Sequence, residues 1–418
     1  MNNFIQFPNT PEDIASIAAN LRVALAEPGP ELAEILVTFE SWAAALSTRE
    51  LDAIPGVAFL KLWLRRGTLE PIILRELGKA ALTGGWEPDG RARLKAFPVG
   101  IVGHWPAGNI EIQPILSLTC GLLGGNAALV RVPSDLVDEI GKMIAPLAAC
   151  KGGEKLLRRM AFLSFDHSRQ ELQEAMAQSV DGAMIWGGKE AVLNIRKLPF
   201  PAWAHISVFG PRLSVAAMDA GAWSDVSQHD AWCQRIARDV WQFDQQACSS
   251  PQALFLEKKP GASIDQFVAA LKKAFEIENR AHPRETVHSS LTSAICQVRA
   301  SWLVADAANK AFFPQSPDWT ILIGSGTALP APTQGKTLTI LEVDNLRGAV
   351  SKFDGNVQTL GLAVADGAKE AELALLAGNR GVDRVVKLGR MHLFVPPWDG
   401  MDLIRPMVRL VRHVPSME

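Results

Sequence analysis

The segment FPVGIVGHWPAGNIEIQPILSLTCGLLGGNAALVRVP, residues 97–133, decides the fold class because its apolar pattern changes twice. FPVGIVGHW is a short apolar run that ends at Pro106 and Gly108, which is typical of a buried strand. IEIQPILSLTCGLLGG has helical length and closes on glycines, and NAALVRVP is strand-like again. Strand, helix and strand in this order predict a βαβ unit with parallel strands.

The same alternation continues toward the C-terminus. MAFLSF and DGAMIWGG are strand-like, and DLVDEIGKMIAPLAAC, SRQELQEAMAQSV and KEAVLNIRKL are helix-like. A second series begins near residue 226 with the helical HDAWCQRIARDVWQF and the strand-like QALFLE. Residues 1–90 repeat apolar residues at helical spacing. The sequence therefore predicts an α/β protein of two domains, with a boundary near residues 220–230.

Composition limits the classes of partner. The chain has 418 residues, with 42 Lys and Arg against 44 Asp and Glu, so neither a nucleic-acid surface nor a polyacidic substrate is expected. The N-terminus lacks the features of a secretory signal, and no apolar run reaches the roughly 20 residues of a membrane span. Five scattered cysteines fit a reducing compartment, so we expect a cytoplasmic protein. The absence of tyrosine excludes a tyrosine general acid.

The stretch WQFDQQACSS, residues 241–250, contains the candidate nucleophile. Cys248 follows a helix-like run and is surrounded by side chains that form hydrogen bonds, which suits either a reactive thiol or an ordinary loop cysteine. The other four cysteines lie in apolar or helical contexts, and we predict that they pack in the core: Cys120, Cys150, Cys233 and Cys296. No CxxC or HExxH spacing occurs, so we expect no metal site.

Candidate ligand-binding residues follow the predicted strands, because parallel sheets bind ligands at the carboxyl ends of their strands. MIWGGKEAV turns on Gly187 and Gly188, which suits either a phosphate or a plain strand-to-helix turn. In LVRVPSD, Arg131 is either a ribose or phosphate contact or a solvated side chain. HWPAGNIEI presents Asn109 as either an oxyanion donor or a helix cap. No GxGxxG follows the first strand, and Pro330 replaces the first glycine of a P-loop.

Taken together and in order, these stretches resemble the aldehyde dehydrogenase superfamily, most nearly its LuxC-type branch of acyl-CoA reductases. The matching stretches are FPVGIVGHWPAGN, GGNAALVRVPSD, DGAMIWGGKEAVLNIRK, HISVFGPRLSV, DVWQFDQQACSSPQ and GVDRVVKLGRMHLF, within residues 97–395. The resemblance implies an aldehyde dehydrogenase-like fold. Residues 1–225 would form N-terminal helices and a Rossmann-type NAD(P)-binding domain, residues 226–395 the catalytic domain, and residues 396–418 a segment on the first domain or at an oligomer interface.

The resemblance also implies roles for individual residues. Cys248 stands at the nucleophile and Asn109 at the oxyanion. Val208 stands where the oxidising enzymes have the glutamate that activates water, and Glu342 in LEVDNL has a context too altered to carry a role. Eight positions fall at the cofactor: Arg131, Pro133 and Ser134 at the adenosine ribose, Trp186, Gly187 and Gly188 beside the pyrophosphate, and Phe209 and Gly210 beneath the nicotinamide.

The activity implied is NADPH-dependent reduction of an acyl thioester to an aldehyde through an acyl-cysteine, with NADH left open as the hydride donor. The acyl donor would be acyl-CoA or an acyl-protein, with an acyl-activating synthetase as a partner and a homo-oligomer as the assembly. Three alternatives stay open: NAD(P)-dependent aldehyde oxidation with another base, reduction of an acyl phosphate, and a non-catalytic scaffold in an acyl-transfer complex.

Overall fold

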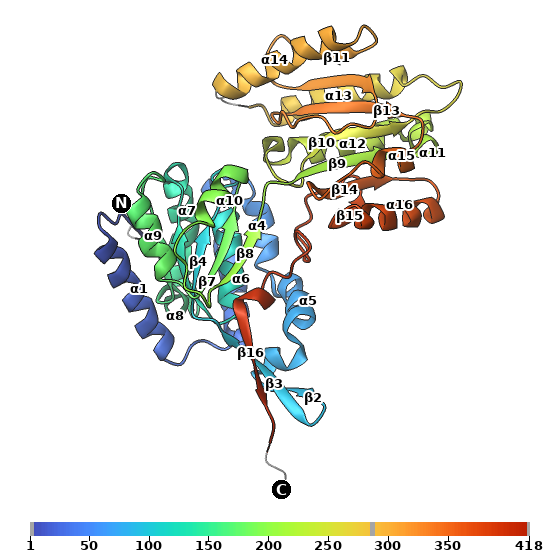
Figure 1. Ribbon diagram of the computed structural model, residues 1–418. Coiled ribbons are helices and arrows are strands. Elements are labelled where there is room, and N and C mark those ends of the chain that lie inside the picture. The colour runs from blue at the N-terminus through green and yellow to red at the C-terminus, as the bar shows by residue number, and fades with distance from the viewer. Residues whose placement is uncertain (1–3, 285–288, 416–418) are drawn as a thin grey trace. The chain divides into compact units, whose positions relative to one another are not determined.

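The predicted βαβ unit forms β4 (Ile101–Trp105), α6 (Gln113–Leu123) and β5 (Ala127–Arg131), and the two strands pair in parallel. Helix α6 is buried from its second residue to its last, as its apolar sequence requires. Figure 1 shows the computed structural model, which describes residues 4–284 and 289–415. The α/β class predicted from the alternating pattern is confirmed.

The chain divides into two units, residues 1–210 with 401–418 and residues 211–400. The first contains a parallel sheet in the order β1-β6-β5-β4-β7-β8, whose order reverses at β4. Its remaining strands are β1 (Ile5–Gln6), β6 (Met160–Leu163), β7 (Gly182–Trp186) and β8 (His205–Phe209), and a separate sheet contains β2 (Glu87–Asp89), β3 (Ala92–Pro98) and β16 (Val408–His413).

Several helices of the first unit pack against its parallel sheet. Apolar residues of three of them, α1, α9 and α10, share one core with β4, β5, β6 and β7. The helices of this unit besides α6 are α1 (Pro11–Ala26), α2 (Leu32–Ala45), α3 (Arg49–Asp52), α4 (Val57–Trp63), α5 (Arg66–Leu77), α7 (Val137–Ile144), α8 (Gly153–Leu157), α9 (Gln170–Gln178) and α10 (Lys189–Ile195).

The second unit is built on the sheet β11-β12-β13-β10-β9-β14-β15, parallel except for β11. Its strands are β9 (Leu213–Met218), β10 (Pro251–Glu257), β11 (Lys310–Phe312), β12 (Thr320–Ser325), β13 (Thr337–Val343), β14 (Val357–Ala363) and β15 (Arg384–Lys387). Its helices are α11 (Ala220–Trp223), α12 (His229–Trp241), α13 (Asp265–Ala281), α14 (Ser289–Ala305), α15 (Leu346–Val350) and α16 (Gly367–Asn379).

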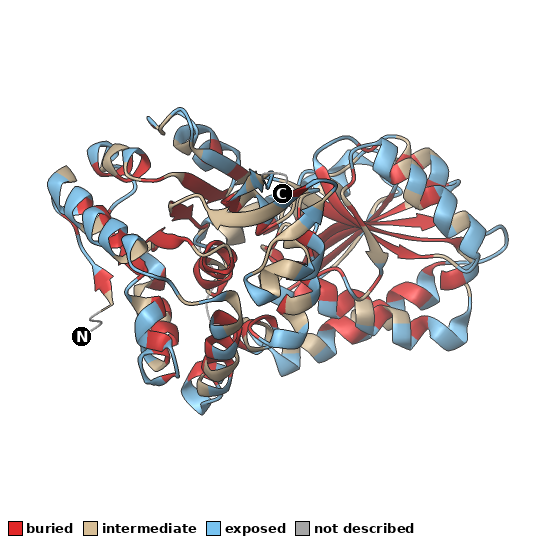
Figure 2. Cartoon of the chain, turned by 90° about the horizontal axis from the view of Figure 1, so that it is seen from below, coloured by how far each residue is buried: buried red, intermediate tan, exposed pale blue. Residues whose placement is uncertain are grey.

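Helices cover both faces of this second sheet. Helices α12 and α13 share one apolar core with it, and α15 and α16 share the other. Figure 2 shows the strands largely buried and the helices exposed on their outer sides, as expected for a parallel sheet covered on both faces. No helix within residues 4–284 and 289–415 is long and apolar enough to span a membrane.

The unit boundary differs from the boundary expected near residue 226. Strand β9 pairs with β10 and β14, so the chain joins the second unit at Pro211. The second series was expected to begin with the helical stretch that forms α12, and β9 precedes that helix along the chain. Residues 401–418 belong to the first unit because β16 pairs with β3.

Candidate active site

The turn that carries Cys248 has an unusual backbone. Helix α12 ends at Trp241, and the next residues include three consecutive non-glycine residues with positive φ: Phe243 at 54°, Asp244 at 52° and Gln245 at 61°. Each such residue costs of order 1–3 kcal/mol, so contacts around the turn must hold it in place. We call residues 241–250 the nucleophile turn.

Two side chains of the turn anchor it. Asp244 Oδ1 forms ion pairs with Arg284 Nη2 at 2.6 Å and Lys336 Nζ at 3.5 Å. The fully buried Gln245 side chain donates from Nε2 to the carbonyls of Pro251 and Thr337, both at 2.8 Å, and accepts from the Thr337 backbone N–H at 2.7 Å. These bonds tie the turn to the starts of β10 and β13.

Further hydrogen bonds fix the residues on either side of the thiol. Ser214 Oγ donates to the Cys248 carbonyl at 2.7 Å. Ser249 Oγ lies 2.9 Å from His392 Nδ1, and His392 Nε2 lies 2.7 Å from the Asp239 carbonyl. A carbonyl only accepts, so Nε2 carries the imidazole proton and Nδ1 accepts from Ser249. The nucleophile turn is thus bonded to His392 in the segment after β15, and through His392 it is linked to α12.

Two β-bulges lie beside the turn. The pairing of β9 with β10 is irregular between Pro251 and Ala253, and its pairing with β14 is irregular between Val357 and Thr359. The extra residues are glutamines, Gln252 and Gln358. Gln252 Nε2 donates to the carbonyls of Gln245 and Ser250, both at 3.3 Å. Bulges of this kind re-aim side chains, and here both amides point at the nucleophile turn or its surroundings.

The surroundings of Cys248 favour the protonated thiol over the thiolate. Burial of the thiol, together with the nearby Asp399 carboxylate, raises its pKa to about 12. A hydrogen bond from Gln358 and the Arg384 guanidinium act in the opposite direction, because both stabilise a thiolate. Gln358 Nε2 also donates to Asp399 Oδ1, so one amide bridges the thiol and the carboxyl group.

The other cysteines differ from Cys248. Cys120, Cys150 and Cys233 are buried, as the sequence predicted. Burial raises the pKa of the Cys120 thiol, which donates to the Leu116 carbonyl at 3.2 Å, and raises that of Cys233 to about 12. The prediction that Cys296 is buried was wrong: it lies on the exposed side of α14, whose helical spacing alone did not reveal which side faces the core.

Three residues around the thiol were not predicted: Gln358, Arg384 and Asp399. They lie at the start of β14, at the start of β15 and in the segment after β15. Together with β9 and β10 they place the thiol at the amino ends of the second sheet's strands, whereas the sequence pattern predicts ligand sites at the carboxyl ends. The segment PPWDG around Asp399 carries no motif that points to a role beside the thiol.

The predicted cofactor residues lie at the carboxyl ends of β5, β7 and β8. Arg131, the last residue of β5, donates from Nη2 to the Phe165 carbonyl at 3.3 Å and lies 5.4 Å from the centre of the Phe165 ring. Its Nε is buried and has no hydrogen-bond partner in the described part of the chain. Pro133 and Ser134 follow directly, and Ser134 Oγ bonds to Asp135 at 3.2 Å.

Two of the other predicted cofactor residues, Trp186 and Phe209, form an aromatic pair. Trp186 and Phe209 are stacked, with ring centres 3.8 Å apart and planes 11° apart, and Trp186 Nε1 donates to Ser117 Oγ at 2.8 Å. Gly188 precedes α10 and Gly210 follows β8, and a Cβ atom on either would meet no atom within 4 Å. Gly187 lies between Trp186 and Gly188, where a Cβ would lie 3.4 Å from that of Ala191. The backbone at these turns is therefore open to a ligand.

The remaining predicted residues lie in the first unit as well. Asn109 is exposed in the loop between β4 and α6, where Ala107 N–H donates to Gln113 Oε1 at 2.7 Å. Val208 is partly buried and packs against the core shared by α1, α9 and α10. No group of three or more His, Cys, Asp or Glu within residues 4–284 and 289–415 is placed to hold a metal ion.

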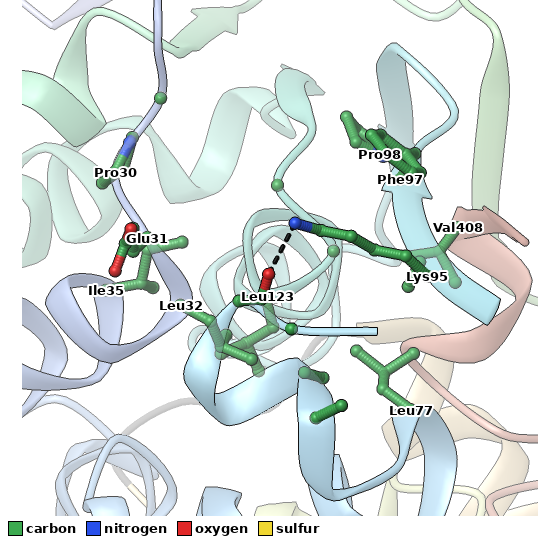
Figure 3. Close-up of a pocket in the computed structure, with 18 of the residues that line it drawn as sticks. Pro30, Glu31, Leu32, Ile35, Leu77, Lys95, Phe97, Pro98, Leu123 and Val408 are labelled. Carbon is green, nitrogen blue, oxygen red and sulfur yellow. Dashed lines mark hydrogen bonds between the residues drawn. The ribbon is translucent and has the colours of Figure 1, made fainter. Parts of the chain in front are cut away.

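A separate cavity of about 380 Å³ lies in the first unit, between the start of α2 and the strand β3 (Figure 3). Its wall includes Leu32, Leu77, Phe97 and Leu123, and Lys95 Nζ donates to the Gly84 carbonyl at 2.6 Å. None of the predicted site residues lines it. The cavity therefore lies apart from the groups with reactive chemistry.

Solved structures with the same fold are aldehyde dehydrogenases. The NADP-dependent glyceraldehyde-3-phosphate dehydrogenase of Bacillus halodurans, complexed with NADP, superposes with a TM-score of 0.72 at 15% identity, covering 96% of this chain and 91% of that one. The NAD-dependent benzaldehyde dehydrogenase of Corynebacterium glutamicum gives 0.71 at 15% identity, covering 97% and 90%. The predicted aldehyde dehydrogenase-like fold is confirmed.

Sequence comparisons identify the branch. A long-chain acyl-protein thioester reductase of Vibrio harveyi is 23% identical over 390 residues, 91% of this chain and 76% of that protein. One from Photorhabdus laumondii is 24% identical over 354 residues, 84% of this chain and 70% of that protein. The family model of acyl-CoA reductase (LuxC) matches residues 39–412. The chain is therefore an oxidoreductase that belongs to the LuxC family of acyl-CoA reductases.

Proposed function

We propose that the protein reduces an acyl thioester to an aldehyde, with Cys248 carrying the acyl group and NADPH as the reductant. The observation that carries this proposal is the setting of Cys248. Its thiol lies in a held turn beside an amide donor, Gln358, and a guanidinium, Arg384, whereas the buried cysteines have no such setting. Gln358 and Arg384 partly offset the burial and the Asp399 charge that raise the thiol pKa, and both would stabilise the thiolate that forms during attack on an acyl group.

The acyl group would pass to the protein in one exchange. Cys248 Sγ forms a bond to the carbonyl carbon, the carbon–sulfur bond of the donor breaks, and the donor leaves as a thiol. The amide of Asn109 and the Cys248 backbone N–H have the role of stabilising the oxyanion in this proposal, where one such donor is worth about 3–4 kcal/mol. The apolar Val208 supplies no base for water, which favours reduction of the acyl group over its hydrolysis.

A nicotinamide dinucleotide fits the residues of the first unit. Arg131 has an unpartnered, buried Nε at the end of β5, and Gly188 and Gly210 leave open space at the ends of β7 and β8. Arg131 supplies positive charge for the 2′-phosphate that distinguishes NADPH from NADH, and the buried, stacked Trp186–Phe209 pair holds the ends of β7 and β8 together beneath the two glycine turns. When bound, NADPH supplies the hydride that converts the acyl carbon to the aldehyde.

The proposed donor is a long-chain acyl thioester, because the similar proteins are named long-chain acyl-protein thioester reductases. We include both acyl-CoA and an acyl group carried on a protein, with an acyl-activating synthetase as the source of the acyl-protein. We also propose that the chain forms a homo-oligomer, as its superfamily commonly does.

A pair of cysteine variants tests the proposal. We expect Cys248→Ala to abolish both the acyl adduct detected by mass spectrometry after exposure to acyl-CoA and the oxidation of NADPH, with little change in stability. Cys120→Ala should keep the adduct and lower the melting temperature, because Cys120 is fully buried in α6. A series of acyl-CoA chain lengths, followed at the nicotinamide absorbance, identifies the preferred donor.

The alternatives give different results in the same experiment. An adduct on Cys120 in place of Cys248 would refute the site. A wild-type protein that gains no acyl adduct from either donor type would favour a scaffold. Production of acid from free aldehyde and NADP, without CoA, would favour an aldehyde oxidiser.

A further inference from the structure

Attack by Cys248 requires a proton acceptor. A thiol whose pKa is raised to about 12 holds its proton at neutral pH, and a positioned base that removes it during attack typically accelerates such a step by about 10²- to 10⁴-fold. Val208, at the position where related oxidising enzymes have a carboxylate, offers no acceptor. A side chain that accepts this proton would lie in another part of the chain.

Within the described part of the second unit, Gln358 forms a hydrogen bond with the thiol, and the charges of Arg384, Arg212 and Asp399 interact with it. An amide and two guanidinium groups do not accept a proton at neutral pH. Asp399 is the one group of this set that does. We refer to Gln358, Arg384, Arg212 and Asp399 as the thiol cluster.

Gln358 sets the geometry of the thiol cluster. It is fully buried, and it is the extra residue of the bulge between β9 and β14. Its amide nitrogen donates to Asp399 Oδ1 and also bonds to the Cys248 thiol. An NH₂ group has two protons, so one amide serves both partners and holds them on the same side of the bulge.

The backbone of Asp399 is constrained, and several opposing effects act on the pKa of its carboxyl group. Asp399 has φ 48°, a conformation that a non-glycine residue adopts only when its surroundings enforce it. Burial raises the pKa of its carboxyl group, while Gln358, Arg212 and Arg384 act to lower it. Arg384 is itself fixed by bonds to the Leu393 carbonyl at 2.6 Å and Thr359 Oγ1 at 3.2 Å. Asp399 is thus a partly buried carboxyl group beside a thiol.

We propose that Asp399 is the base that takes the proton of Cys248 when the thiol attacks, with Gln358 as a positioning residue that holds the two groups together and Arg384 stabilising the sulfur charge. This inference rests on the proposed function and names the base that it requires. Thiol and carboxyl group share one proton, which lies on sulfur at rest and on Asp399 during the attack.

The step balances without another reactant. The S–H bond of Cys248 breaks as an O–H bond forms on Asp399, and the Cys248 Sγ–carbon bond forms as the donor's carbon–sulfur bond breaks. The departing thiolate takes the proton from Asp399, which returns to the carboxylate. The overall reduction then consumes one NADPH and one proton from solvent, and releases the aldehyde, the donor thiol and NADP⁺.

A purely repulsive role for Asp399 makes the opposite kinetic prediction. If the carboxylate only opposes formation of the thiolate, its removal lowers the thiol pKa and accelerates acylation. If it is the base, its removal also lowers the thiol pKa but slows acylation, because no group remains to take the proton. Two measurements on one variant therefore separate the two roles.

The experiment uses the full chain with Cys296→Ser, which removes the exposed thiol that would also react. The variants are Asp399→Asn, Asp399→Glu and, as a matched control, Asp344→Asn, whose carboxylate is 85% exposed. The first measurement is the rate of Cys248 alkylation by iodoacetamide as a function of pH, without substrate. The second is the rate of acyl transfer from acyl-CoA to Cys248 at pH 7, without NADPH, by quenched-flow mass spectrometry.

We expect Asp399→Asn to move the alkylation midpoint to lower pH and to slow acylation by about 10²-fold or more. Asp399→Glu should recover part of the acylation rate, and Asp344→Asn should match the parent in both measurements. Faster acylation in Asp399→Asn, or an unmoved alkylation midpoint, overturns the inference. If the parent takes up no acyl group, both the proposed function and the role of Asp399 as its base fail. A shift of the alkylation midpoint in Asp399→Asn would then show only that the Asp399 charge acts on the thiol.

Discussion

At the scale of single residues, positions 208 and 399 distinguish the proposed reductase from the related oxidising enzymes. The resemblance places Val208 where that carboxylate activates water. The structure packs Val208 against an apolar core and puts a different carboxyl group, Asp399, beside the thiol. In the proposed reaction the thiol is activated without a base for water, so the acyl group persists until it is reduced.

Arg131 carries the prediction on cofactor choice. We expect Arg131→Ala to raise the KM for NADPH about tenfold with a smaller change for NADH, because a contact to the 2′-phosphate worth about 1.4 kcal/mol is lost. Steady-state kinetics with both nucleotides measures this, and Arg196→Ala, an exposed arginine just after α10, is the control. An equal rise for NADPH and NADH would instead indicate that Arg131 acts only by holding Phe165.

At the scale of elements, the nucleophile turn depends on side chains that hold an unfavourable backbone. Three left-handed residues follow α12, and Gln245, the last of them, bonds to the starts of two strands. The turn is therefore specified by the contacts of β10 and β13 as much as by its own sequence.

Gln245→Ala tests this dependence. Removing the Gln245 amide leaves the buried Thr337 N–H and the carbonyls of Pro251 and Thr337 without their partner. Each unsatisfied group lowers the stability of the fold by about 1–3 kcal/mol. We expect a clear fall in the free energy of unfolding in urea and slower acylation of Cys248. Gln242→Ala, at an exposed position of the same turn, should change neither. Equal stability of the two variants would mean that the turn holds its shape without the Gln245 amide.

The elements that could be predicted from sequence are those with a local pattern. The βαβ alternation from residue 97 onward predicted β4, α6 and β5, and the position of Cys248 after a helix was also predicted. The bulge at Gln358 has no local pattern, because it exists only in the register between β14 and β9. Asp399 and Arg384 come near Cys248 from about 140 residues further along the chain, and they meet it at the amino ends of the strands, opposite to the edge that parallel sheets generally use for ligands.

At the scale of the whole chain, the predicted site residues of the two units lie at different edges of their respective sheets. The first follows the general rule, with the predicted cofactor residues at the carboxyl ends of β5, β7 and β8. The second has its thiol at the amino ends of β9, β10 and β14, where hydrogen bonds from α12 and from the segment after β15 meet. Two buried titratable groups lie among these contacts: His392, and the Asp239 carboxyl group, which accepts from the Gly389 backbone N–H at 2.7 Å. The stability of the fold should therefore depend on pH through them.

The pKa shifts of these two groups have opposite consequences. Burial raises the pKa of Asp239 from 3.8 to about 7, so the folded state binds more protons than the unfolded state, and stability is lost as pH rises from about 4 to 7. Burial lowers the pKa of His392 from 6.5 to about 4, so stability is lost as pH falls through that interval. Between pH 4 and 6.5 the two slopes, each at most about 1.4 kcal/mol per pH unit, oppose each other.

Removing one group should therefore reveal the other. In Asp239→Asn we expect the free energy of unfolding to rise more steeply with pH between 4 and 6.5 than in the wild type, because only His392 then contributes. In His392→Asn it should rise less steeply or fall. Urea unfolding at several pH values measures the slopes, and Asp230→Asn, an exposed carboxylate on the same helix, should leave the slope unchanged. If the free energy of unfolding has the same pH dependence in both variants as in the wild type, neither Asp239 nor His392 changes its protonation on folding. Any pH dependence of stability would then come from other residues.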